Sequence, residues 1–196
     1  MSIDSVFQSF PQLETRRLVL RRLQLTDSEA LFGILADDHV TRYYDEPSFA
    51  EPSQACLQIE SWENGFINKR CIRWGIARKG DPAIIGTCGY YGLHSWHLRG
   101  SIGYELARRC WRQGFMTEAL TALLALGFET MGLNRKEAVV MPGNEASIKL
   151  LEKLGFRNEG LLKEYENWGS KGFTDLCMLG LTRKMWVAKG LEEKGG

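Results

Sequence analysis

The segment 101–129 constrains the fold most, because its periodicity changes from that of a strand to that of a helix. Ile102, Tyr104 and Leu106 alternate with small or polar residues, which indicates a β-strand. From Thr117 to Phe128, apolar residues recur at three- and four-residue spacing, in a segment too long for an ordinary strand. The sequence therefore predicts a strand that leads through a turn into a long helix.

The turn between these two elements is basic and contains one glycine: Arg108-Arg109-Cys110-Trp111-Arg112-Gln113-Gly114. Such a turn aims unpaired backbone N–H groups and the positive end of the helix dipole at one point, where a phosphate group can bind. A single glycine fits neither the Gly-Lys-Ser/Thr loop of nucleoside triphosphate sites nor the three-glycine dinucleotide fingerprint. The turn is a candidate anion-binding cradle, and the alternative is that its arginines are solvated surface charge.

Length and charge narrow the class of protein. The composition does not shift along the 196 residues, which favours a single domain, 1–196, with a core from about 14 to 185 and a flexible tail from about 189. Lys plus Arg number 25 and Asp plus Glu 24, so no nucleic-acid partner is expected. The amino end lacks a secretory pattern and the longest apolar run is too short to cross a bilayer, so no membrane partner is expected either.

The cysteines and histidines do not form a recognisable site. Five cysteines at scattered positions are typical of reduced thiols in a cytoplasmic protein. His94 and His97 lie near Cys88, but without an acidic or Cys-x-x-Cys partner no metal is expected. Cys110 is a candidate nucleophile only because it lies in the basic turn.

The remaining periodicities predict a mixed α/β (α+β) domain. Thr26 and Glu29 form the Thr-x-x-Glu capping-box pattern, which predicts that the first helix begins there. Further helices are expected at 53–68, 117–128 and 144–155, and strands at 17–23, 72–77, 83–92, 102–106, 136–141, 156–166 and 174–183. This order describes a central twisted mixed sheet of about six to seven strands, flanked by about four helices.

Three motifs follow one another along the chain. They are Ile102-Gly103-Tyr104-Glu105-Leu106, then Trp111-Arg112-Gln113-Gly114-Phe115-Met116-Thr117-Glu118-Ala119, then Asn144-x-x-Ser147 with Gly155-Phe156. With these motifs the chain, from about 14 to 183, resembles the GNAT superfamily of acyl-CoA-dependent N-acetyltransferases. The resemblance is to the branch typified by RimJ and RimL, which acetylate the amino termini of ribosomal proteins. It implies the GNAT fold, in which the co-substrate acetyl-CoA lies in a cleft between two splayed parallel strands.

The resemblance also implies which residues bind acetyl-CoA. Backbone N–H groups from 112 to 117 would hold the pyrophosphate, with Arg109 and Arg112 to neutralise it, and Asn144 and Ser147 would reach the pantetheine arm. Trp111 and Met116 depart from the residues that are usual in the family's phosphate loop. The expected cofactor-binding residues are Tyr104, Glu105, Leu106, Arg109, Trp111, Arg112, Gln113, Gly114, Phe115, Met116, Thr117, Asn144 and Ser147.

Acetyl transfer to an amine needs a neutral nucleophile, a donor for the developing oxyanion and a proton for the leaving sulfur, but no acyl-enzyme. The resemblance makes Glu166, 19 residues after Ser147, the expected base, with Glu105 on the central strand as the alternative. Many family members place an acidic tyrosine where this chain has Leu151, so the acid role falls to Ser147 or to water. Both glutamates could instead be surface carboxylates, and Asn144 and Ser147 an ordinary helix cap.

The expected activity is transfer of acetyl from acetyl-CoA to a primary amine, with a protein amino terminus of the ribosomal-protein type as the favoured acceptor. A small amine (polyamine, antibiotic or amino acid derivative) is the alternative acceptor, and a non-catalytic acyl-CoA-binding regulatory protein is the alternative class. The acidic loop 37–51 either attracts a cationic amine or is simply solvated; it contains Asp37, Asp38, Tyr43, Tyr44, Asp45 and Glu46. The sequence is compatible with a monomer or a homodimer.

Overall fold

The computed structural model describes residues 2–192 of the chain, and within them the strands form one eight-stranded mixed sheet. Its order is β1-β2-β3-β4-β5-β6-β8-β7, and every neighbouring pair is antiparallel except β5 and β6, which are parallel. The strands are β1 (Leu13–Glu14), β2 (Leu18–Arg22), β3 (Ile72–Arg78), β4 (Ile84–His94), β5 (Arg99–Leu106), β6 (Arg135–Val140), β7 (Arg157–Asn167) and β8 (Phe173–Thr182).

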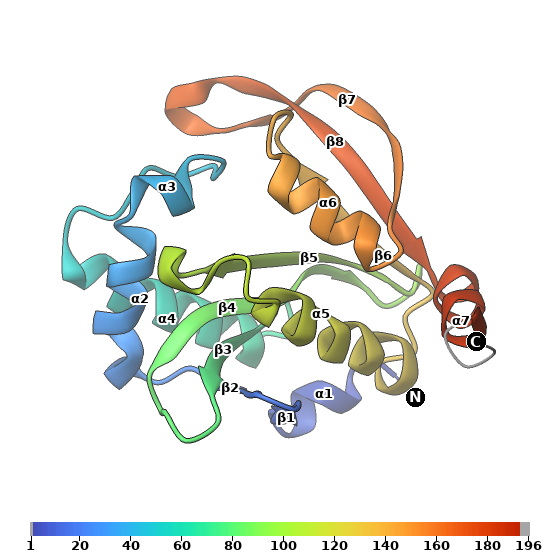
Figure 1. Ribbon diagram of the computed structural model, residues 1–196, viewed down its shortest axis with the longest axis horizontal. Helices are drawn as coiled ribbons and strands as arrows, with labels where there is room; N and C mark the ends of the chain where they lie inside the picture. The colour runs from blue at the N-terminus through green and yellow to red at the C-terminus, as the bar shows by residue number, and fades with distance from the viewer. Residues whose placement is uncertain (1, 193–196) are drawn as a thin grey trace.

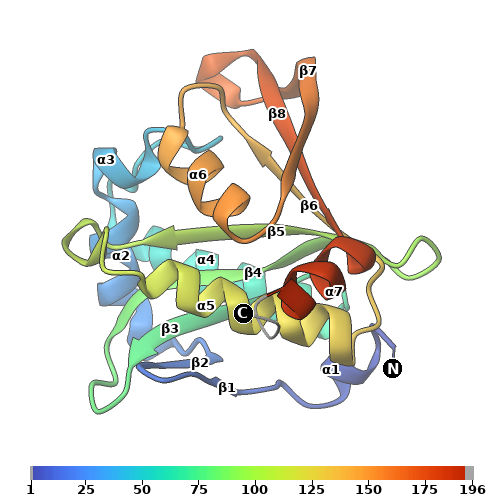
Figure 2. The same ribbon diagram turned by 45° about the vertical axis from the view of Figure 1, so that its right-hand side comes forward.

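Helices cover the two faces of this sheet. In Figures 1 and 2, α2 and α4 lie behind strands β2 to β5, α5 lies across the front, and α6 packs beside β6, β8 and β7. The helices are α1 (Ser5–Gln8), α2 (Ser28–Leu35), α3 (Asp38–Thr41), α4 (Pro52–Ile67), α5 (Phe115–Ala125), α6 (Glu145–Lys153) and α7 (Arg183–Glu192). The arrangement confirms the predicted mixed sheet with helices on its faces.

The numbers of elements exceed the prediction of six to seven strands and about four helices. The additional strand is β1, which has two residues, and α1 and α3 are single turns of four residues. Elements this short carry no measurable periodicity. Helix α7 was not predicted because its apolar residues Met185, Trp186 and Val187 are consecutive; it overlaps the tail expected from 189, and residues 193–196 lie outside the described part.

The first long helix begins differently from the Thr26–Glu29 capping box that the sequence predicts. A 3₁₀ turn, Leu25–Asp27, precedes α2, and the reciprocal capping contacts join Gln24 and Asp27 instead. Asp27 is buried and forms an ion pair of 2.7 Å with Arg21. The buried ion pair holds Asp27 at the helix start, so the capping contacts form two residues earlier than the local pattern indicates.

The core between α5 and the sheet contains a buried lysine. A π-helical segment, Leu126–Thr130, continues α5, and side chains from the sheet reach the carbonyl groups just before it. The Tyr90 hydroxyl donates to Leu123 O (2.7 Å), and Lys136 Nζ donates to Leu124 O (2.8 Å). Burial lowers the pKa of Lys136 to about 5, so this amine is neutral at physiological pH.

The parallel strands β5 and β6 pair over only three residues each. Arg99, Gly100 and Ser101 face 135–137, and beyond this point the strands separate while β5 stays paired with β4 and β6 with β8. The sheet is thereby divided into a half made of β1 to β5 and a half made of β6, β8 and β7, which stand apart in Figure 2. This is the splay of parallel strands that the resemblance to the GNAT superfamily implies.

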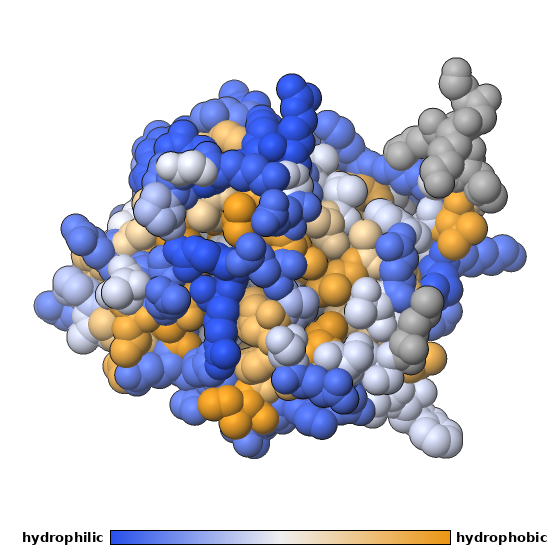
Figure 3. Space-filling view, turned by 90° about the horizontal axis from the view of Figure 1, so that it is seen from below, coloured by the Kyte–Doolittle hydropathy of each residue, from blue (hydrophilic) through white to orange (hydrophobic). Residues whose placement is uncertain are grey.

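None of the helices among residues 2–192 is long and apolar enough to cross a membrane. The face seen in Figure 3 carries apolar groups interspersed with charged residues. Folded proteins ordinarily keep a large share of apolar atoms at the surface, so these groups need no partner to explain them.

Candidate active site

A cavity of about 1210 Å³ lies where the two halves of the sheet separate. Its lining includes Ile102, Tyr104 and Leu106 from β5, and also Gly103 and Glu105 between them. Successive strand residues point to opposite faces, so the cavity reaches both faces of the sheet through the splay. One end lies beside α5 and α6, and the other beside α4.

The basic turn forms the end beside α5. Arg112 (φ 59°) and Gly114 (φ 77°) both have left-handed backbone conformations, which turn the chain into α5 at Phe115. The backbone bond from Glu118 N to Gly114 O (3.0 Å) begins the helical ladder, so the N–H groups of 115–117 precede it. With the positive end of the helix dipole, these groups form a cradle suited to an anion.

Contacts from distant residues hold the cradle in shape. Trp111 Nε1 donates to Leu106 O (2.7 Å), which anchors the turn on the end of β5. Arg17 Nη1 donates to Gln113 O (3.0 Å), and the Arg17 guanidinium also pairs with Glu118 at 2.6 Å. Sequence reasoning missed Arg17, because no local pattern links it to a turn about a hundred residues further on.

Most of the expected cofactor-binding residues line the cavity, and Arg109 and Gln113 do not. Gln113 Nε2 instead donates to Arg109 O (2.8 Å), and the Arg109 charge acts on Asp81 in the turn between β3 and β4. Of the two arginines expected to neutralise a pyrophosphate, only Arg112 therefore lies on the cavity. Met116 lines the cavity and is also buried in the core.

The first turn of α6 contributes a serine at the middle of the cavity. Asn144 caps this helix, and its Oδ1 accepts from Ser147 N at 3.2 Å. The Ser147 hydroxyl lies 2.7 Å from the Tyr104 hydroxyl of β5. Leu151, one turn later, is fully buried, so the serine provides the polar group here.

Glu105 faces the α4 end of the cavity and is almost completely buried, with 1% of its side chain exposed. Its Oε2 accepts from Arg73 Nη2 and from the Tyr44 hydroxyl, and its Oε1 accepts from Thr87 Oγ1. Arg73 also donates to Thr87 Oγ1 (2.6 Å) and stacks its guanidinium on Trp62, 4.9 Å from the ring centre. Both carboxylate oxygens are thus occupied.

The pKa values of Arg73 and Tyr44, which both contact Glu105, are raised, as expected for groups beside a negative charge. Burial opposes the charge of Arg73, but Glu105, Tyr44 and Cys88 together outweigh it and raise the pKa of Arg73. Burial, together with the negative charge of Glu105, holds the pKa of Tyr44 well above its usual value. Arg73 therefore stays cationic and Tyr44 stays a hydroxyl donor, and sequence reasoning did not single out Arg73 although it interrupts an apolar strand.

Glu166 lies at the far end of β7, in very different surroundings. Its side chain is exposed, lines the cavity and accepts from Trp168 Nε1 at 3.1 Å. Desolvation of the hydroxyl and the nearby charge of Glu166 raise the pKa of Tyr91, on the Glu105 side of the sheet, to about 12. The structure thus brings Glu166 near the α4 end of the cavity with one carboxylate oxygen free of protein donors among the described residues.

The acidic loop divides into two parts. Asp45 and Glu46 line the cavity, whereas Asp37 caps α3 by accepting from His39 N (2.9 Å) and Asp38 accepts from Ser48 Oγ. Tyr43 donates to Gly143 O (2.9 Å), and Lys171 Nζ donates to the carbonyls of Arg42 and Tyr44. These contacts tie the loop to the turn before α6 and to the hairpin of β7 and β8.

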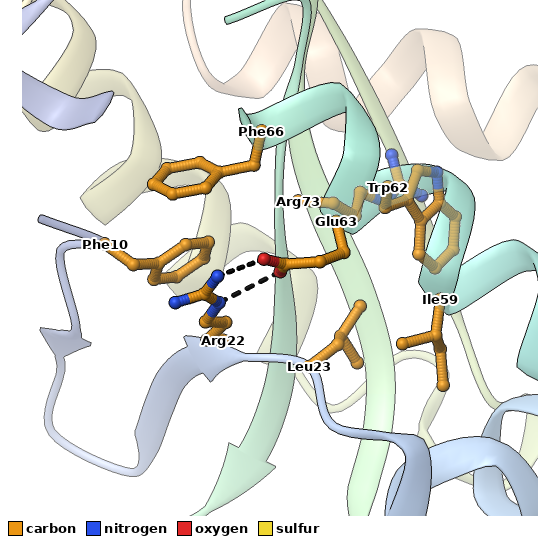
Figure 4. Close-up of a pocket in the computed structure, with 8 residues that line it drawn as sticks. All are labelled: Phe10, Arg22, Leu23, Ile59, Trp62, Glu63, Phe66 and Arg73. Carbon is orange, nitrogen blue, oxygen red and sulfur yellow. Dashed lines mark hydrogen bonds and ion pairs between the residues drawn. The ribbon is translucent and has the colours of Figure 1, made fainter. Parts of the chain in front are cut away.

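A small hollow of about 10 Å³ lies on the outer side of Trp62 and Arg73 (Figure 4). It has room for about one water molecule. Beside it Arg22 forms a bidentate pair with Glu63, joining the end of β2 to α4. Trp62 and Arg73 are therefore a wall between this hollow and the large cavity.

Of the cysteines and histidines singled out in the sequence, Cys110 lines the large cavity, while Cys88, His94 and His97 do not. His94 and His97 have ring centres 6.1 Å apart, beside the turn between β4 and β5. Burial raises the pKa of Cys88 to about 12, so its sulfur stays protonated. Cys110 is buried where the basic turn meets the core.

Comparison with known proteins identifies the family. Residues 17–157 match the family model of the acetyltransferase (GNAT) domain. The chain belongs to the GNAT family of acetyltransferases. The matched residues contain the cradle, Glu105 and Ser147, while Glu166 lies beyond them in the hairpin of β7 and β8.

Relatives of this GNAT domain include proteins with and without a described acceptor. The chain is 43% identical over 156 residues to the uncharacterized N-acetyltransferase YoaA of Bacillus subtilis, which covers 80% of this chain and 88% of that protein. It is 28% identical over 166 residues to the [ribosomal protein uS5]-alanine N-acetyltransferase of Escherichia coli (79% and 82%). Its fold matches Mycobacterium smegmatis RimJ in complex with CoA-disulfide, with a TM-score of 0.75, 25% identity and coverage of 85% and 82%.

Proposed function

We propose that this chain, as a single domain, transfers acetyl from acetyl-CoA directly to a protein amino terminus of the ribosomal-protein type. The observation that carries the proposal is the continuous cavity, which joins an anion cradle at α5 to an aromatic and acidic end at Glu166. A thioester cofactor bound at the first end and an amine bound at the second would come together where β5 and β6 separate. The similarity to the [ribosomal protein uS5]-alanine N-acetyltransferase supports the choice of acceptor.

Acetyl-CoA fits the end beside α5. The backbone N–H groups of 115–117 and the Arg112 side chain would bind the pyrophosphate, which carries negative charge. Asn144 and Ser147 would face the pantetheine arm where it passes between β5 and β6. Arg109 and Gln113 would support the turn from outside the cavity.

Glu166 is the proposed base, acting on the acceptor amine through water. Its exposed carboxylate can accept a proton without breaking an ion pair, whereas Glu105 would have to give up donors at both oxygens. An α-amino group has a pKa of about 8, so its deprotonation at pH 7 costs only about 1 kcal/mol. A weak base that acts through water is sufficient for such an acceptor. Glu105 would then have a structural role, which is to hold Arg73 and Tyr44 in place.

Glu166→Gln is expected to lower kcat/KM by about 10- to 100-fold at pH 7. The deficit should shrink as the pH rises past about 8, because the amine then loses its proton to solvent. Glu164→Gln, on the same strand and outside the cavity lining, is the matched control and should stay close to wild type. Steady-state rates over a pH series, with Glu105→Gln in parallel, measure this; equal activity of the Glu166 and Glu105 variants would contradict the assignment.

The acidic end of the cavity favours an acceptor that arrives as a cation. Asp45, Glu46 and Glu166 line this end together. Replacing Asp45 by Asn and Glu46 by Gln should raise the acceptor KM about three- to tenfold at low salt, and less at high salt. Glu29→Gln with Glu60→Gln makes the same charge change on exposed helix positions. An unchanged KM at low salt would show that the two loop carboxylates are merely solvated.

Thiol release from acetyl-CoA tests the whole proposal. The acceptors are peptides with free Ala or Ser amino termini, spermidine, a lysine peptide with a blocked terminus, and buffer alone. Turnover confined to the free-terminus peptides is expected. Turnover only with spermidine or another small amine would replace the acceptor, and binding of acetyl-CoA without turnover on any amine would favour a regulatory acyl-CoA-binding protein.

A further inference from the structure

A side-chain contact bridges the two halves of the sheet where their backbones no longer pair. Tyr104 lies three residues beyond Ser101, the last residue of β5 that pairs with β6. Its hydroxyl reaches the Ser147 hydroxyl in the first turn of α6, with 2.7 Å between the two oxygens. Both residues line the cavity. The contact therefore crosses the cleft in which the thioester is proposed to lie.

The surrounding hydrogen bonds fix Ser147 in place and leave Tyr104 as its tyrosine partner. Ser147 is held from behind, because its backbone N–H donates to Asn144 Oδ1 (3.2 Å). Three other tyrosines that line the cavity have their own acceptors: Tyr43 donates to Gly143 O, Tyr44 to Glu105 and Tyr90 to Leu123 O. Among the tyrosines of residues 2–192 whose bonds are described, Tyr104 is the one that contacts Ser147.

The direction of the hydrogen bond decides what Ser147 can do. A serine hydroxyl carries one hydrogen, so a serine that donates to tyrosine has none left for a ligand. The phenol is the stronger acid of the two and the aliphatic oxygen the better acceptor, which favours donation from Tyr104 to Ser147. Burial raises the pKa of Tyr104 to about 12, so the phenol keeps its hydrogen at physiological pH.

We propose that Tyr104 is a positioning residue for acetyl transfer: its hydroxyl donates to Ser147 Oγ and thereby turns the Ser147 hydrogen toward the thioester sulfur. This inference rests on the proposed function. As the amine nitrogen bonds to the acetyl carbon and the C–S bond breaks, the electron pair moves to sulfur. The hydrogen bond from Ser147 stabilises that charge, while the amine proton leaves by way of Glu166 and neither hydroxyl loses its proton.

The kinetic test uses Tyr104→Phe, Ser147→Ala and the double variant. Tyr104→Phe should lower kcat about tenfold with the KM for acetyl-CoA changed by less than about twofold. The double variant should be no slower than Ser147→Ala, since Tyr104 acts through the serine. Tyr165→Phe, at an exposed position on β7 outside the cavity lining, is the matched control. Wild-type kcat in Tyr104→Phe, or losses that multiply in the double variant, would overturn the inference.

A second measurement separates this inference from the proposed function, because it needs no acceptor and no turnover. The thiol of bound coenzyme A is titrated through the ultraviolet absorbance of its thiolate. Its pKa should be higher in Tyr104→Phe than in wild type, since the thiolate loses an oriented donor. Equal thiol pKa values would overturn the role of Tyr104 even if the enzyme acetylates peptides. Failure of wild type to bind coenzyme A at all would overturn both proposals.

Discussion

Replacing Arg73 by methionine is expected to lower the free energy of unfolding by about 3–5 kcal/mol. Glu105 has 1% of its side chain exposed, and Arg73 is the positive charge paired with it. The variant leaves that carboxylate buried with only Thr87 and Tyr44 as donors. A buried charge without a counter-ion costs far more than the pair itself contributes.

Urea unfolding near neutral pH measures this effect, and Arg22→Met is the matched control. The Arg22 side chain is 49% exposed in its pair with Glu63, so its loss should cost under about 1 kcal/mol. Adding Glu105→Gln to Arg73→Met removes the uncompensated charge and should recover part of the stability. If Arg73→Met loses no more stability than Arg22→Met, Glu105 is not held as an ion in the fold.

Replacing Lys136 by methionine is expected to change how stability depends on pH. The pKa of Lys136 falls from 10.5 to about 5 on burial, so between these values the unfolded chain binds one proton more than the folded chain. This residue therefore makes the free energy of unfolding rise by about 1.4 kcal/mol per pH unit in that window. The penalty is absent above pH 10.5 and complete below about pH 5.

The stability difference between pH 6 and pH 8 should accordingly be about 3 kcal/mol smaller in Lys136→Met than in wild type. At pH 7 the variant should be more stable by roughly 2 kcal/mol, since the cost of neutralising the amine exceeds the loss of its bond to Leu124 O. Denaturant unfolding at several pH values measures both quantities. Lys184→Met, at an exposed position on α7, is the control, and equal pH slopes in the Lys136 variant and wild type would contradict a neutral buried amine.

The elements with strong periodicity could be located from the sequence to within a few residues. The strand predicted at 102–106 is β5 (Arg99–Leu106), and the helix predicted at 53–68 is α4 (Pro52–Ile67). The helix predicted from 117 begins earlier, at Phe115, because its first turn emerges directly from Gly114. Helix starts depend on capping contacts, which the apolar period does not report.

The sequence does not distinguish the carboxylates of the acidic loop by their surroundings. Asp37, Asp38, Asp45 and Glu46 look alike in the sequence, yet only Asp45 and Glu46 line the cavity. The other two accept hydrogen bonds from His39 and Ser48. A loop has no sequence period that predicts which way its side chains point. Only the folded backbone decides whether each carboxylate faces solvent, caps a helix or lines the cavity.

The periodicities of the sequence by themselves determined the mixed sheet and the strand–turn–helix cradle. The family and the candidate roles of Ser147 and Glu166 are implied by the resemblance of its three motifs to the GNAT superfamily. Only the tertiary structure decided that Arg73 neutralises Glu105, that Tyr104 reaches Ser147 and that Lys136 is buried against α5. The partners in these contacts lie 32, 43 and 12 residues apart, and strand register, the splay of β5 from β6 and the packing of helices on the sheet bring them together.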